Sequence, residues 1–365
     1  MVTIAVDAMG GDFGHAVTVD GARLALDLLR KSGILSKEML RFLFFGDGDK
    51  ISEELKKHIE VAEITEIVHA DVIVTNEMKP IDAMRHRHDS NLGLAIDAVA
   101  RGRADAVVSA ANTGAYIALA KTILGTLPFV ERPAIPAVMP HVNGKSIVLD
   151  LGANLECSAE RLVQFALMGE SFARSLLKKE SPSVGLLNVG AEEMKGHATV
   201  QTAGRLLHNI SKHTSTADGE AHTKEKESLA HSYFNFHGFI EGNDIFRGVT
   251  DVVVTDGFSG NIALKAIEGV IWFFFKLLKD SMKDSLVSKL VGLTVLPTLR
   301  KIKKTIDPRL YNGAVLLGLK KIAVKSHGGA DSFGFAQAIK VGVQMVQSSF
   351  LEDVEKRLQL LPEIQ

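Results

Sequence analysis

The sequence is poor in several features that define whole classes of protein. Its one cysteine, Cys157, allows neither an internal disulfide nor a metal site built from cysteines. Lysine and arginine total 42 and aspartate and glutamate 43, so no charge excess favours nucleic acid as a partner. The opening MVTIAVDAMGGD lacks the segments of a signal peptide, and no apolar run reaches the ~18 residues of a spanning helix. We therefore expect a cytoplasmic protein.

Signature motifs of three enzyme classes are missing as well. The sequence contains no GxSxG, no GxxxxGK followed by Ser or Thr, and no GxGxxG after its first apolar run. These absences disfavour a covalent serine hydrolase, a P-loop nucleotide hydrolase and a standard nicotinamide dehydrogenase. Cys157 lies near Glu156 and Glu160, and neighbouring carboxylates raise the pKa of a thiol, so we interpret this cysteine as a packed side chain.

Short runs rich in Val, Ile and Leu are frequent, and longer stretches with a period near 3.6 residues separate them. This alternation predicts an α/β fold with a largely parallel sheet. The runs expected to form strands are residues 3–7, 41–47, 104–110, 145–152, 183–190 and 250–257.

Two regions interrupt this alternation. Residues 211–232 are polar and lack apolar periodicity, which predicts an exposed insertion loop. Residues 262–305 predict a long helical excursion, which Gly292 and Pro297 divide into a protruding hairpin with an apolar tip. The apolar residues of the predicted tip are Leu290, Val291, Leu293, Val295 and Leu296.

The predicted strands end in a common style, in which glycines, Asn, Ser and acids precede a helical pattern. The first N–H groups of a helix are unpaired, glycine lets an anion approach closely, and Asn and Ser add neutral donors. In parallel sheets these strand ends lie at one edge. If all of them open on the same edge, they predict a phosphate pocket. Its expected residues are Asp7, Gly10, Gly11, Asp12, Asn112, Thr113, Gly114, Asn154, Asn188, Glu193, Lys195, Asp256, Gly257, Ser259, Gly260, Asn261 and Lys265.

Each of these ends also has a purely structural interpretation. A turn and a helix cap would account for Asp256 and its neighbours, and for Asp7 with the following glycines. Lys195 could equally be a solvated surface cation. The agreement among several ends is what favours function.

Taken in order along the chain, the motifs resemble the PlsX family of bacterial phosphate acyltransferases, over nearly the whole length. The motifs that carry the resemblance are VDAMGGDFG, KPIDAMRHRHDS, VVSAANTGAY, LDLGAN, GLLNVGAEEMKG, FIEGNDI and DVVVTDGFSGNIALKAIEG. The resemblance implies one catalytic domain over residues 1–365, with a three-layer α/β/α fold like that of phosphotransacetylase and isocitrate dehydrogenase. It also implies that residues 211–232 are an insertion.

The reaction that the resemblance implies is transfer of a fatty acyl group from acyl-[acyl carrier protein] to inorganic phosphate, which gives an acyl phosphate for phospholipid synthesis. Phosphate itself attacks the thioester, so no enzyme nucleophile, metal or organic cofactor is required. Lys195, from the family's EExKG motif, is expected to neutralise charge, and Asn112, Asn154 and Asn261 to donate hydrogen bonds. Asp256 has three open roles: orienting Lys195, orienting Lys265, or accepting a proton from phosphate.

The resemblance also implies a homodimer that associates peripherally with the membrane. The apolar tip, with lysines around it, is suited to an anionic membrane face, where a membrane acyltransferase would take the acyl phosphate. The same lysines could meet acyl carrier protein, which is acidic. For the aromatic part of the predicted hairpin, Trp272 to Leu278, the alternative to membrane contact is packing against a second copy in the dimer.

Two other functions stay open from the sequence. A phosphotransacetylase using acyl-coenzyme A would share the fold and the phosphate site. A membrane-docked scaffold without activity would share the apolar tip, although the presence of Lys195 and the three asparagines argues against a decayed site.

Overall fold

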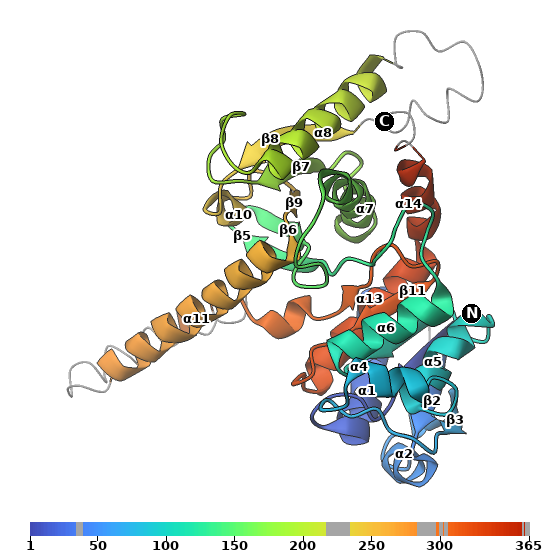
Figure 1. Ribbon diagram of the computed structural model, residues 1–365. Coiled ribbons are helices and arrows are strands. Elements are labelled where there is room, and N and C mark those ends of the chain that lie inside the picture. Colours follow the sequence, from blue (N-terminus) through green and yellow to red (C-terminus); the bar gives the residue numbers. More distant parts are fainter. Residues whose placement is uncertain are drawn as a thin grey trace.

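The computed structural model describes residues 1–33, 39–216, 234–282, 297–298, 302, 306–359 and 361. Within them the chain forms two separate β-sheets, each covered by helices (Figure 1). The six-stranded sheet has the order β10-β11-β4-β1-β2-β3, and the five-stranded sheet the order β5-β6-β9-β7-β8. All pairs are parallel except those at one end of each sheet, β10 with β11 and β5 with β6.

The six-stranded sheet is buried on both faces because its strands are apolar at nearly every position. Ile4 and Val6 of β1 point to one face and pack with α1 and α13, whereas Ala5 points to the other face, toward α5 and α6. The strands and helices are β1 (Val2–Asp7), α1 (Gly14–Lys31), β2 (Leu40–Gly46), α2 (Gly48–Leu55), α3 (Ile59–Ala62), β3 (Thr65–His69), α4 (Pro80–Arg85), α5 (Asn91–Ala100), β4 (Ala106–Ser109), α6 (Thr113–Leu124), β10 (Ala314–Val315), β11 (Ile322–Lys325) and α13 (Ser332–Gln347).

The five-stranded sheet is built in the same way around three valines. Val252 and Val254 pack toward α7 and α8, and Val253 joins a smaller cluster on the opposite face. The elements are β5 (Ala137–His141), β6 (Gly144–Leu149), α7 (Ala159–Leu177), β7 (Ser183–Leu187), α8 (Ala198–Thr216), β8 (Asn235–Ile240), α10 (Asp244–Arg247), β9 (Val252–Val254), α11 (Gly257–Ser281) and α14 (Phe350–Leu358). One apolar core runs through both sheets by way of α7, α13 and α14.

All six predicted strands are present, and the predicted α/β fold with helices on both faces is confirmed. The prediction that the strand ends open on one edge is wrong. The ends of β1 and β4 belong to the six-stranded sheet, and those of β6, β7 and β9 to the five-stranded sheet. Local apolar patterns determine which segments become strands, but pairing depends on contacts between distant segments, which these patterns do not encode.

Helix α11 projects away from both sheets, as Figure 1 shows. Its large apolar side chains are exposed along its length, with Val270 65%, Trp272 64% and Phe273 55% accessible. The five predicted tip residues lie outside the described residues. No helix in the described part of the chain is both long and apolar enough to cross a membrane.

The start of the predicted insertion loop is wrong by six residues. Helix α8 continues to Thr216, so residues 211–216 are helical. The sequence of this stretch, SKHTST, is polar throughout, so a search for apolar periodicity does not detect the helix. The remainder of 211–232 lies outside the described residues.

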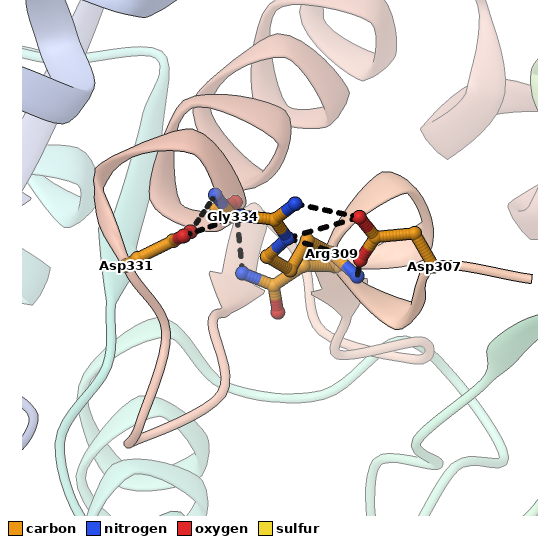
Figure 2. A network of polar contacts seen from close by, with 5 residues as sticks. Asp307, Arg309, Asp331 and Gly334 are labelled. Atoms are coloured by element: carbon orange, nitrogen blue, oxygen red, sulfur yellow. Dashed lines mark hydrogen bonds and ion pairs between the residues drawn. The ribbon is translucent and has the colours of Figure 1, made fainter. Parts of the chain in front are cut away.

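A network of charged residues joins η3 to the loop between β11 and α13, beside the six-stranded sheet. Arg309, in the 3-10 helix η3 (Pro308–Tyr311), donates to Asp307 at 2.7 Å and to Asp331 at 2.7 Å (Figure 2). These two carboxylates raise the pKa of the guanidinium further above its ordinary value. Asp331 also caps α13 by accepting from the Gly334 N–H. The network therefore fixes the loop between β11 and α13.

Candidate active site

The N-terminus of α11 carries the motif DGFSGN, and its residues have clear packing roles. Asp256 caps the helix, with one carboxylate oxygen accepting from the Ser259 N–H at 2.7 Å and the other from the Ser259 hydroxyl at 3.0 Å. The Gly257 N–H donates to the Asn154 carbonyl and the Gly260 N–H to the Asp256 carbonyl. Several first-turn donors are thus already used within the protein.

The two glycines of this motif allow α11 to contact the end of β6. A Cβ at Gly257 would lie 2.6 Å from the Asn154 carbonyl oxygen, and a Cβ at Gly260 would overlap the carbonyl oxygen of Asp150. Asn261 lies over Gly152 of the same loop. Gly257 and Gly260 therefore allow close packing between two strand ends of the five-stranded sheet.

Asn154 is buried below this contact. Its amide group donates to the Pro133 carbonyl and to the Asp150 carboxylate, both at 3.0 Å, and its Oδ1 has no hydrogen-bond partner among the described residues. Asp150 also accepts from the N–H groups of Asn154 and Ile135. Burial raises the pKa of the Asp150 carboxyl despite these bonds.

Lys195 lies in the loop after β7 and is held at its backbone. The Asn188 amide donates to the Lys195 carbonyl at 3.0 Å, and the Gln201 amide donates to the carbonyls of Met194 at 2.9 Å and Gly196 at 3.2 Å. The ammonium group remains half-exposed and pairs with Glu192 at 2.8 Å. This hydrogen bond to Glu192 raises the pKa of Lys195, so the side chain is a cation at neutral pH.

A pocket of about 290 Å³ lies between these two strand ends. Its polar wall consists of Asn188 and His197 from one side and Asp256 and Ser259 from the other. The remaining residues are mainly apolar: Leu162, Leu186, Leu187, Val189, Val200 and Val254, with Gly242 and Thr255. Polar groups around an apolar floor are typical of a site for a small molecule. His197 and Gln201 were not identified from the sequence, although His197 immediately follows the EEMKG motif and Gln201 lies four residues further on.

Asp7 and its neighbours occupy the other sheet. Asp7 is fully buried and accepts hydrogen bonds from the side chains of Asn91 and Ser109 and from the Gly10 N–H. Burial raises the pKa of its carboxyl. A Cβ at Gly10 would overlap the Asp7 carboxylate. Asp7 thus ties together β1, β4 and α5 inside the protein.

Asn112, Thr113 and Gly114 begin helix α6 at the end of β4. The side-chain Oδ1 of Asn112 accepts from the Ala115 N–H at 3.1 Å, and its side-chain amide donates to the Asn76 carbonyl at 3.0 Å. Asn112 is therefore a helix cap that also holds the segment around Asn76. The sequence prediction placed it in one pocket with Lys195, but the two residues follow strands of different sheets.

Two further residues of the predicted site, Lys265 and Glu193, lie at the surface. Lys265 is exposed and pairs with Glu268 at 2.7 Å, and Glu193 is exposed beside Glu192. The Asp256 carboxylate bonds Ser259, whereas Lys195 and Lys265 pair with other acids, so none of these ion pairs supports an orienting role for Asp256.

Cys157 is a packed thiol, as predicted. Burial raises its pKa to about 11, and the nearby Asp150 contributes, whereas the sequence had suggested Glu156 and Glu160. In the portion of the chain that the structure describes, no group of three or more His, Cys, Asp and Glu side chains is placed to hold a metal ion.

The architecture resembles that of solved phosphotransacetylases. A phosphotransacetylase from Staphylococcus aureus matches the fold with a TM-score of 0.57 at 15% identity, over 94% of each chain. A phosphotransacetylase from Streptococcus pyogenes matches with a TM-score of 0.52 at 15% identity, also over 94% of each chain. The fold is thus that of the phosphotransacetylases.

Sequence similarity defines the family. Residues 2–353 match the family model described as fatty acid synthesis protein. The phosphate acyltransferase of Paramagnetospirillum magneticum is 42% identical over 99% of this chain and 95% of its own length. That of Gluconacetobacter diazotrophicus is 45% identical over 98% of this chain and 88% of its own length. The chain belongs to this family of phosphate acyltransferases, enzymes of fatty acid and phospholipid synthesis.

Proposed function

We propose that the enzyme transfers a fatty acyl group from acyl-[acyl carrier protein] to inorganic phosphate, and that the reaction takes place at the carboxyl edge of the five-stranded sheet. The observation that carries this location is the pocket between Asn188 and Asp256, which combines a polar wall with an apolar floor. Lys195 follows Asn188 in a loop fixed by side-chain amides. This edge therefore offers a half-exposed cation, on a loop whose backbone is fixed, beside an apolar surface for an acyl chain.

The chemistry needs little from the protein besides positioning and charge stabilisation. A phosphate oxygen attacks the thioester carbonyl, a tetrahedral oxyanion forms, and the carbon–sulfur bond breaks to release the thiolate of the carrier. A cation and neutral donors that stabilise the developing negative charge lower the barrier to this step. We assign Lys195 to the phosphate or the oxyanion. The neutral donors of the proposed site are Asn188 and Ser259, which line the pocket, and Asn261 near the start of α11.

Asp256 acts in this proposal as the cap that orients α11 toward the pocket. Its carboxylate is hydrogen-bonded by Ser259 through both oxygens. The dipole of a 25-residue helix favours an anion at this end, where phosphate would bind. The residues at the edge of the six-stranded sheet, among them Asp12, Thr113 and Gly114, are not assigned to phosphate.

The test is phosphate-dependent release of free thiol from palmitoyl-[acyl carrier protein]. We expect Lys195→Ala to lower kcat/KM at least about 100-fold, the loss expected for one strong charge contact in the transition state. Lys57→Ala is a matched control, because Lys57 pairs with Glu54 at 2.7 Å with the same spacing and a similar exposure. Equal activity of the two variants would exclude the role of Lys195. If the wild type released no thiol, acyl-[acyl carrier protein] would be excluded as the acyl donor.

Comparison of donors separates the proposal from its nearest alternative. A phosphotransacetylase-type enzyme would prefer acyl-coenzyme A, whereas we expect the carrier-bound acyl group to give the higher kcat/KM. An enzyme that binds vesicles and turns over neither donor would be the scaffold that the sequence left open.

The exposed aromatic surface of α11 supports a protein partner within this proposal. Large exposed apolar patches mark interaction surfaces, and Trp272, Phe273 and Phe274 are each more than half accessible. We assign this part of α11 to a homodimer interface, and the tip that follows to an anionic membrane face that delivers acyl phosphate to a membrane acyltransferase. The single catalytic domain of residues 1–365 would then carry one docking arm.

Separate substitutions distinguish the two partners. Phe273→Asp with Phe274→Asp should convert a dimer into a monomer in sedimentation velocity. Leu293→Asp with Leu296→Asp should release the protein from phosphatidylglycerol vesicles while phosphate-dependent turnover persists. Unchanged sedimentation or unchanged vesicle binding would exclude the corresponding partner.

A further inference from the structure

A second pocket, of about 450 Å³, opens at the carboxyl edge of the six-stranded sheet. Gly11 and Asp12, which follow β1, form one wall. The segment of Thr75, Asn76 and Glu77 forms the other. The pocket shares no lining residue with the one beside Lys195.

Hydrogen bonds between distant segments hold these walls in place. The Asn76 amide donates to the Asp12 carboxylate at 2.6 Å, and the Asn76 carbonyl accepts from the Asn112 amide at 3.0 Å. The Asp12 N–H donates to the Gly328 carbonyl at 2.9 Å. These bonds join the segments that follow four different strands, β1, β3, β4 and β11, around one pocket.

Gly11 is restricted by this arrangement. Its φ is +85°, a left-handed conformation that favours glycine, and a Cβ would lie 2.8 Å from the Gly328 carbonyl oxygen and 2.9 Å from the Ala110 Cβ. Glycine here lets the β1 loop pack against the loop after β11. The network of Arg309, Asp307 and Asp331 anchors that second loop where it enters α13 (Figure 2).

A buried cation supports the wall from behind. The Lys325 ammonium donates to the backbone carbonyls of Ala110 and Ser326, close to the carboxylates of Asp7 and Asp12. Burial lowers its pKa to about 8, and the two carboxylates oppose this shift. Lys325 therefore offsets part of the negative charge of Asp7 and Asp12 while it donates to the loops that follow β4 and β11.

The chemistry of the lining selects the ligand. Asp12 and Glu77 are carboxylates, Asn76 and Thr75 offer an amide and a hydroxyl, and Met9 and Ile73 add apolar surface. Among the described residues that line the pocket there is no lysine or arginine. Two carboxylates repel a phosphate dianion but accept hydrogen bonds from N–H and O–H groups. A neutral, elongated ligand with amides, a hydroxyl and a small apolar group fits these walls.

We propose that this pocket binds the pantetheine arm of the acyl donor, through the carboxylate of Asp12 and the polar groups of Thr75 and Asn76. This inference rests on the proposed function, because it assigns the thioester-bearing part of the same donor to the second sheet edge. The arm consists of amides, a hydroxyl and a dimethyl group, which match the acceptors and the apolar residues of the pocket. Its own phosphate would remain outside the acidic walls.

The experiment compares a donor that has the arm with one that lacks most of it. Hexanoyl-pantetheine and hexanoyl-N-acetylcysteamine carry the same acyl thioester, so the ratio of their kcat/KM values measures what the arm contributes. We expect Asn76→Ala to lower this ratio about ten-fold, the effect of losing a hydrogen bond of ordinary strength. Thr75→Val, which leaves the bond between Asn76 and Asp12 intact, should lower it several-fold.

Asn143→Ala is the matched control, because Asn143 is an exposed asparagine in the turn between β5 and β6. A ratio that stays at the wild-type value in both Asn76→Ala and Thr75→Val, while both donors are turned over, would overturn the inference and leave the proposed function intact.

Competition identifies the natural source of the arm. Both holo-[acyl carrier protein] and coenzyme A carry it, and inhibition of hexanoyl-pantetheine turnover by either supports the pocket, with the stronger inhibitor identifying the source. Inhibition by neither would overturn the inference. If the wild type turned over no donor, the proposed function would fail, and calorimetry with pantetheine alone would still decide this inference: binding that is lost in Asn76→Ala supports it, and absence of binding overturns it.

Discussion

The two sheet edges use similar glycine-rich loops for different electrostatic purposes. The edge of the five-stranded sheet has a half-exposed lysine, Lys195, in a loop beside a pocket with an apolar floor. The edge of the six-stranded sheet has a buried lysine, Lys325, which donates to backbone carbonyls, and its pocket is lined by carboxylates. An exposed cation suits a charged substrate that changes during the reaction. A buried cation suits a wall that must keep its shape.

Glycine substitution should reveal the strongest contrast between the two edges. Gly260→Ala places a methyl group against the backbone carbonyl of Asp150, which cannot move freely, so we expect a loss of about 3 kcal/mol in the free energy of unfolding. Gly114→Ala is the counterpart at the other edge, where the nearest atom, a side-chain carbon of Pro80, lies 3.1 Å away and can adjust. Urea denaturation should show a smaller loss, below about 1 kcal/mol. Equal losses would contradict the packing difference.

The pH dependence of stability should distinguish the two lysines. Folding lowers the pKa of Lys325 from 10.5 to about 8, so between these values the unfolded chain holds a proton that the folded chain has released. Stability from this group is therefore lowest below pH 8 and rises as the pH approaches 10.5. Relative to Lys325→Met, the wild type should gain about 2 kcal/mol in the free energy of unfolding between pH 7 and pH 10.

Lys195→Met provides the comparison, because the pKa of Lys195 is raised by Glu192 and the side chain is exposed. Its difference from the wild type should stay nearly constant over the same pH range. Denaturation curves at several pH values measure both, and a flat difference for Lys325→Met would show that its ammonium is not destabilised by burial.

The helix caps should give the smallest effects. Asp256→Ala and Asn112→Ala each remove a side chain that accepts from a first-turn N–H, so each should lower the free energy of unfolding by about 1 kcal/mol. Asp256→Asn keeps an acceptor and should retain both stability and turnover. If Asp256→Asn were as stable as the wild type but inactive, Asp256 would be a proton acceptor and not only a cap.

The sequence was sufficient to predict strands whose apolar character is continuous, such as residues 183–190 and 250–257, because burial on both faces leaves this pattern. It was not sufficient to assign them to sheets. The short strand β11, IAVK, was not predicted, although Ser-His-Gly-Gly-Ala-Asp follows it in the style of the other strand ends. With β11 missing, neither Lys325 nor the packing of Gly11 against the loop after β11 could be found.

The predicted site residues also divide into those whose role depends on distant contacts and those whose role depends on local spacing. Asp7 and Asn154 were chosen as polar groups at strand ends, and both are buried with partners that lie far away in the sequence, so burial could not be read from local pattern. Lys195 was chosen from its motif and is accessible. The capping role of Asp256 was anticipated as a structural interpretation, since the spacing of a cap is local, whereas that of Asn112 was not.

The central claim, that phosphate binds at the five-stranded edge and not at the six-stranded one, is tested most directly by calorimetric titration with inorganic phosphate. The account predicts that wild type and Asn76→Ala bind phosphate equally and that Lys195→Ala binds it at least about ten-fold more weakly, as expected for loss of a charge-assisted contact. Phosphate binding that is unaffected in Lys195→Ala but weakened in Asn76→Ala would contradict the claim and move the phosphate site to the other sheet.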